Sequence, residues 1–135
     1  FTPGVATKEI VSYLPDADFL NADWTAEDAI RVYSMFFADF DADKAASMVD
    51  FFGLPSDRRL SEMSKGMGEK LQISLIMSRR ARVFLLDEPI SHLDEANGRT
   101  LAGLITAEAT AQGASVIVTS VGKHLPLEYH HTYQL

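Results

Sequence analysis

The 135-residue sequence contains no cysteine, which excludes a disulfide scaffold and cysteine-ligated zinc or iron–sulfur centres. We expect no signal peptide, and no apolar run in the sequence approaches the roughly 20 residues that a membrane-spanning helix needs. Positive charge is scarce, because 12 lysines and arginines stand against 19 acidic residues. The net charge of −7 argues against a broad nucleic-acid-binding surface. With 47% hydrophobic residues, the composition is that of one soluble globular domain.

Charge is distributed unevenly along the sequence. Residues 16–50 carry nine acids and two bases, whereas residues 57–82 carry three acids and seven bases. The two stretches could simply lie on two solvent-exposed faces of the protein. Alternatively, the basic stretch could bind an anion. Charge alone does not decide between these interpretations.

The hydrophobic pattern predicts strands that alternate with helices. Strands are expected over residues 8–14, 82–87, 115–119 and 131–135. Because the second and third of these contain consecutive apolar residues, they resemble strands that are buried on both faces. The alternation of strand and helix in the second half of the chain implies an α/β fold with a parallel sheet covered by helices.

Four helices are expected. The first begins at Thr25, whose hydroxyl can cap it, and it should bury a wide face. That face consists of Ala29, Val32, Tyr33 and Phe36, flanked by Ile30 and Phe37. The other helices are expected over residues 41–52, over residues 69–78 after a turn at Gly66 and Gly68, and from the cap Asp94 to about residue 111. Residues 20–56 therefore form a predicted all-helical insertion.

The strand ending in Asp87 and Glu88 carries the most informative chemistry. At the carboxyl edge of a parallel sheet, where α/β proteins bind ligands, two adjacent carboxylates would be presented. One carboxylate can hold Mg²⁺, directly or through water, and the adjacent one can orient a water molecule for attack on a phosphoryl group. The alternative is an acid that merely caps the next helix.

A second stretch, Ser64-Lys65-Gly66-Met67, leads directly into a helix. Backbone N–H groups, a hydroxyl and the positive end of a helix dipole together form an anion site. An ordinary helix cap is the alternative. Downstream of the paired carboxylates, Ser91-His92-Leu93-Asp94 predicts a tight turn that returns an acid to the same edge.

In this order and spacing, these pieces resemble the ATP-binding cassette (ABC) ATPases over nearly the whole chain. Residues 63–67 resemble a variant of the family's signature motif, and residues 85–89 resemble its Walker B strand. Residues 91–94 resemble the D-loop, and Asp16 stands at the position of the Q-loop.

The resemblance implies a partial nucleotide-binding domain over residues 1–135, with a P-loop NTPase-like parallel sheet. Within it, residues 20–56 would be the helical subdomain and residues 82–135 part of the RecA-like core. ATP and Mg²⁺ are the implied cofactors, with Asp87 as metal ligand and Glu88 as catalytic residue. The signature residues would act in trans, which means that they would bind ATP held by a second domain; they are Ser64, Lys65, Gly66 and Met67. Asp94 in the D-loop would couple the two sites.

The implied function is ATP hydrolysis that powers transport by a bacterial ABC transporter. The implied partners are a second ABC nucleotide-binding domain, in a homo- or heterodimer, and a transmembrane permease subunit. The protein would then be cytoplasmic and peripheral at the inner face of the cell membrane. No nucleic-acid partner is expected.

The sequence also departs from the family pattern. It contains no G-x-x-x-x-G-K-[ST] phosphate loop, so we expect a fragment that lacks the Walker A region and is inactive alone. Asp16 replaces the Q-loop glutamine, and Val121 stands where the family places its switch histidine, with His124 as the candidate substitute. Two alternatives therefore remain: a hydrolytically degenerate regulatory partner, and a soluble ABC ATPase outside transport.

Overall fold

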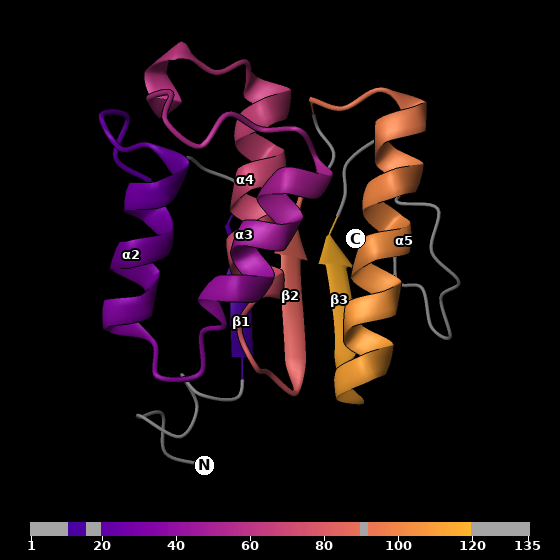
Figure 1. Cartoon of the computed structure of the whole chain (residues 1–135). Helices are drawn as coiled ribbons and strands as arrows, with labels where there is room; N and C mark the ends of the chain where they lie inside the picture. Colours follow the sequence, from indigo (N-terminus) through magenta and orange to yellow (C-terminus); the bar gives the residue numbers. More distant parts are fainter. Residues whose placement is uncertain (1–10, 16–19, 90–91, 120–135) are drawn as a thin grey trace.

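The computed structural model describes residues 11–15, 20–89 and 92–119 (Figure 1). Within these ranges, three parallel strands form a sheet in the order β1-β2-β3: β1 (Val11–Leu14), β2 (Val83–Asp87) and β3 (Ser115–Thr119). The predicted parallel α/β arrangement is therefore confirmed. The strand expected over residues 131–135 lies outside the described residues.

The helices are α2 (Ala26–Phe36), α3 (Ala42–Phe51), α4 (Lys65–Met77) and α5 (Glu95–Gln112), with a short 3-10 helix, η1 (Leu60–Glu62). In Figure 1 the three strand arrows point upward, whereas α4 and α5 descend beside them. The amino ends of α4 and α5 therefore lie on the same side of the molecule as the carboxyl ends of the strands, above the tips of the arrows in this view (Figure 1). This arrangement is the one in which a parallel sheet gathers ligand-binding groups at one edge.

Side-chain caps fix where three helices begin, and two of them, at Thr25 and Asp94, are the caps predicted from the sequence. The Thr25 hydroxyl accepts a bond from the Asp28 N–H at 3.1 Å, and Asp28 accepts one from the Thr25 N–H at 3.0 Å. This capping box satisfies two donors that the first turn leaves open. The bond from the Thr25 backbone and that from Arg31 lower the pKa of Asp28. Asp41 and Asp94 cap α3 and α5 in the same manner.

One face of the sheet forms the main core with α4 and α5. Leu14, Phe84 and Leu86 point to this face and are buried against apolar side chains of both helices. On the opposite face, Tyr13 and Ile117 are 48% and 52% exposed. The prediction that β2 and β3 are buried on both faces is thus wrong for the described part of the chain, since the helices pack on one face only.

A second core joins α2 and α3 to the outer side of α4. Ala26 and Ala29 of α2 and Val49 of α3 pack here against Leu71 and Leu75. Two small residues on α2 let this helix approach α4 closely.

Phe36 does not join this core, contrary to the sequence prediction. It lies in the last turn of α2 and is 76% exposed. The buried stripe of the helix is narrower than expected, because α2 contacts its neighbours mainly through Ala26, Ala29 and the half-buried Ile30 and Tyr33.

The start of α4 also differs from the prediction. The helix begins at Lys65, four residues earlier than expected, so Gly66 and Gly68 lie in its first turns. The reason is the cap: the Ser64 hydroxyl accepts a bond from the Met67 N–H at 3.2 Å, which compensates for the low helix propensity of glycine.

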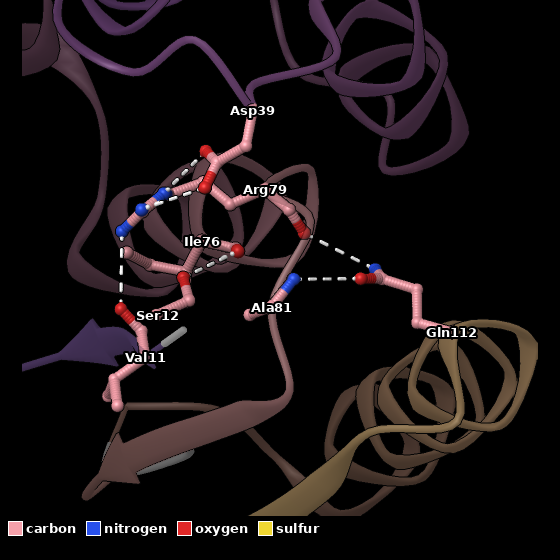
Figure 2. A network of polar contacts seen from close by, with 7 residues as sticks. All are labelled: Val11, Ser12, Asp39, Ile76, Arg79, Ala81 and Gln112. Carbon is pink, nitrogen blue, oxygen red and sulfur yellow. Dashed lines mark hydrogen bonds and ion pairs between the residues drawn. The ribbon is translucent and has the colours of Figure 1, made fainter. Parts of the chain in front are cut away.

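A buried arginine ties the segment between α2 and α3 to the core (Figure 2). Arg79 Nε and Nη2 donate to the two carboxylate oxygens of Asp39 at 3.0 and 3.1 Å, and Nη1 donates to the Val11 carbonyl at 3.4 Å. The guanidinium also lies 3.9 Å from the centre of the Phe37 ring. One member of the basic stretch is therefore a structural residue, not part of an anion site.

The same network continues on the other side of Arg79. Its carbonyl oxygen accepts a bond from the Gln112 side chain at 3.2 Å, and Gln112 accepts one from the Ala81 N–H at 2.9 Å. Nearby, burial raises the pKa of Tyr33 to about 12, although the positive charge of Arg79 acts to lower it. The turn that connects α4 to β2 is thus held from both sides.

Candidate nucleotide site

The carboxyl end of β2 places two carboxylates in different surroundings. Asp87 lies beside Thr119 of β3, whose hydroxyl donates a hydrogen bond to Asp87 Oδ1. Glu88 follows in a left-handed backbone conformation, with φ of 50°, and its N–H donates to the Thr119 carbonyl at 2.9 Å. Among the described residues it alone has positive φ without being glycine, and such positions are uncommon and often functional.

The amino end of α4 is exposed. Ser64 and Lys65 are both accessible, whereas Met67 is half-buried and packs against the second core. The Met67 N–H, which the sequence assigns to phosphate binding, donates to the Ser64 hydroxyl here. An anion at this end would therefore meet the helix dipole, the Ser64 hydroxyl and the earlier N–H groups of the first turn.

Residues His92 and Leu93, shortly before α5, pack on this end of α4. A Cβ atom at Gly66 would lie 3.2 Å from the His92 carbonyl oxygen, so a larger residue there would have to displace this backbone by a few tenths of an ångström. Glu69 accepts a bond from the His92 N–H at 3.0 Å, and its other oxygen lies 2.7 Å from His92 Nδ1. Leu93 is buried in the main core.

Asp94 occupies the cap of α5. Its side chain accepts bonds from the Asn97 N–H at 2.8 Å and from Asn97 Nδ2 at 3.0 Å. The structure thus brings together the amino end of α4, the loop at residues 92–94 and the start of α5. Sequence reasoning missed Glu69 in this cluster, and the only signal was an acidic residue one turn after the Ser64–Met67 stretch. Asp16, Val121 and His124 lie outside the described residues.

The donor chemistry fits Mg²⁺ held together with phosphate. Among the described residues, no three His, Cys, Asp or Glu side chains gather as a metal site would require. Mg²⁺ in phosphate-transferring proteins is commonly held by one or two carboxylates, water and the phosphates of the substrate. Asp87, held in place by Thr119, could supply such a carboxylate oxygen.

Comparison with known proteins identifies the family. Residues 4–91, more than half of the chain, match the family model described as ABC transporter. The chain belongs to the ABC transporter family. As an ABC protein it resembles the ABC transporter ATP-binding protein YtrB of Bacillus subtilis, at 22% identity over 84% of this chain and 39% of the relative. It also resembles the cytochrome c biogenesis ATP-binding export protein CcmA of Albidiferax ferrireducens, at 37% identity over 59% of this chain and 39% of the relative.

The fold is that of ABC ATPase domains. The dimeric ATP-binding cassette MJ0796, bound to ADP and Pi in its post-hydrolysis state, matches with a TM-score of 0.69 and 14% identity over 84% of this chain and 53% of that one. The α/β, P-loop NTPase-like fold class predicted from the sequence is therefore confirmed. This ABC chain spans about two fifths of the length of the two curated relatives named above. No helix within the described ranges is long and apolar enough to cross a membrane.

Proposed function

We propose that this chain is the C-terminal, larger part of an ATP-binding and ATP-hydrolysing subunit of a bacterial ABC transporter. The observation that carries the proposal is the pair of carboxylates at the end of β2. The Thr119 hydroxyl holds the Asp87 carboxylate beside β3, whereas Glu88 follows in the left-handed backbone conformation just after the strand. Adjacent residues can thus take two different roles.

Asp87 would hold Mg²⁺ and Glu88 would act on water. When bound, Mg²⁺ neutralises charge on the phosphate oxygens of ATP. The Glu88 carboxylate accepts a hydrogen bond from the attacking water and draws its proton, so that the oxygen can attack the terminal phosphorus. The P–O bond to the leaving ADP breaks, and inorganic phosphate is released.

The exposed end of α4 supports a second role for the same chain. In a dimer with a second ABC domain, Ser64, Lys65, Gly66 and Met67 would face the terminal phosphate of ATP held by that partner. Asp94 would lie between the two sites. The division into a helical subdomain (residues 20–56) and a RecA-like core part (residues 82–135) belongs to the same proposal.

The membrane partner is part of the proposal too. The helical subdomain, beside the segment that contains Asp16, would dock a transmembrane permease. The protein would then work in the cytoplasm at the inner face of the membrane. Relatives named for ABC transport and export support this assignment.

Replacing the proposed catalytic carboxylate tests the function. In the full-length protein, Glu88→Gln should lower the rate of ATP hydrolysis by about 10²–10⁴-fold, because an amide cannot take a proton from water. Binding of Mg-ATP, measured by calorimetry, should be unchanged. Glu95→Gln is the matched control, since the Glu95 side chain is 80% exposed and forms a surface ion pair with Arg99 on the same helix.

Two results would contradict the proposal. Hydrolysis by Glu88→Gln at the parent rate would show that Glu88 is not the catalytic carboxylate. A parent protein that binds Mg-ATP without hydrolysing it would favour a degenerate regulatory partner instead.

A further inference from the structure

We propose that Glu69 is a positioning residue of the ATPase site: through His92 it holds the backbone at residues 92–94, a few residues after Glu88, against the amino end of α4. This inference rests on the proposed function and adds to it a connection between its two halves. Glu69 itself would touch neither ATP nor Mg²⁺.

The contact uses both oxygens of the Glu69 carboxylate. Oε1 accepts a bond from the His92 backbone N–H at 3.0 Å, and Oε2 lies 2.7 Å from the His92 ring nitrogen Nδ1. The Glu69 side chain is only 14% exposed, whereas that of His92 is 46% exposed. A two-point contact fixes the direction of this backbone as well as its distance from α4, which a single bond cannot do.

Two further contacts hold the same stretch of backbone independently of Glu69. The His92 carbonyl lies so close to Gly66 that a Cβ there would be 3.2 Å away, and the Leu93 side chain would be at 3.4 Å. Leu93 is itself buried in the main core. Residues 92 and 93 are therefore held by a polar contact, a close backbone approach and apolar burial.

The position of this contact gives it a role beyond stability. His92 lies four residues after Glu88 and two before Asp94, and Glu69 lies one turn after the exposed end of α4. In the proposed dimer, that end of α4 meets ATP held by the partner, whereas Glu88 acts on ATP held by this chain. The Glu69–His92 pair thus connects the elements that serve two different nucleotides.

Hydrogen exchange without nucleotide tests the contact itself. In the full-length protein, Glu69→Ala should raise the exchange of amides at residues 92–94 and in the first turn of α4. Lys44→Ala is the matched control, because it removes an ion pair of 3.0 Å to Glu108 that joins α3 to α5 away from residues 92–94. It should leave both segments at the parent rate.

Steady-state hydrolysis tests the positioning role. Glu69→Ala should lower kcat by about tenfold or more while KM for Mg-ATP stays unchanged, since small displacements of reacting groups are costly. Glu69→Gln should restore most of kcat, because its amide keeps an acceptor for the His92 N–H at the same reach. His92→Ala, which keeps the backbone bond and loses the ring contact, should give a smaller loss than Glu69→Ala.

The outcomes separate this inference from the function on which it rests. A parent protein without ATPase activity overturns both. An active parent whose Glu69→Ala variant keeps its kcat, or whose Glu69→Gln variant is as slow as Glu69→Ala, overturns the inference alone. If Glu69→Ala does not fold, His92→Ala decides: unchanged exchange and kcat in that variant overturn the inference.

Discussion

The two ends of α4 differ sharply in their surroundings. At its amino end, Ser64 and Lys65 are exposed, whereas every residue from Leu71 to Arg79 is buried between the two cores and the α4–β2 turn. Buried residues hold the fold together but cannot reach a ligand. Exposed residues contribute little to stability but are free to contact a ligand. The helix thus joins a scaffold to a ligand-binding end, and substitutions at the two ends should have different effects.

The largest loss of stability is expected beneath the buried half of α4. Phe84→Ala should lower the free energy of unfolding by about 3–5 kcal/mol, because Phe84 is fully buried against this helix and its loss leaves a cavity. Phe36→Ala is the matched control and should change stability by less than about 0.5 kcal/mol, since Phe36 is exposed. Denaturant unfolding measures both. Equal losses would remove the distinction between scaffold and surface.

A somewhat smaller loss is expected at the carboxyl end of α4. Asp39→Ala should lower the free energy of unfolding by about 3 kcal/mol, because it leaves the buried guanidinium of Arg79 without its bidentate partner. By contrast, Arg31→Ala, which removes the exposed partner of Asp28, should lower the free energy of unfolding much less than Asp39→Ala does. Thermal unfolding of both variants tests this order, and a reversed order would show that Arg79 is not part of the scaffold.

Along α4 itself, the smaller effect on stability is expected at the exposed amino end. Ser64→Ala should lower the free energy of unfolding by about 1 kcal/mol, because the helix loses its cap. Ser64→Thr should keep most of the stability that the cap provides, because threonine retains the hydroxyl. Denaturant unfolding of the two variants provides the measurement. A loss above about 3 kcal/mol for Ser64→Ala would mean that this end belongs to the scaffold after all.

Local chemistry explains what the sequence predicted correctly. Thr25, Asp41 and Asp94 mark the starts of three helices because each cap bond joins a side chain to the backbone N–H three residues further on. The strands at β2 and β3 follow from short apolar runs bounded by polar residues. The positions of Asp87 and Glu88 at the carboxyl edge follow from the parallel sheet itself.

Contacts between distant residues explain what the sequence could not predict. Arg79 pairs with Asp39 across 40 positions, and His92 with Glu69 across 23. Neither pairing has a local pattern, so the basic stretch could not be divided into structural and anion-facing residues. The left-handed backbone at Glu88 likewise has no signal in residue type, because glycine is the usual residue there.

Hydrogen exchange on addition of Mg-ATP tests most directly whether the exposed end of α4 and the end of β2 form the nucleotide site. The full-length Glu88→Gln variant suits this measurement, because slow hydrolysis keeps ATP bound. We expect new protection at residues 65–68 and 86–89, and little change over Leu71–Met77, which is already buried. Bound nucleotide that protects other parts of the protein, such as the outer face of α5, and leaves these two segments unchanged would contradict the account.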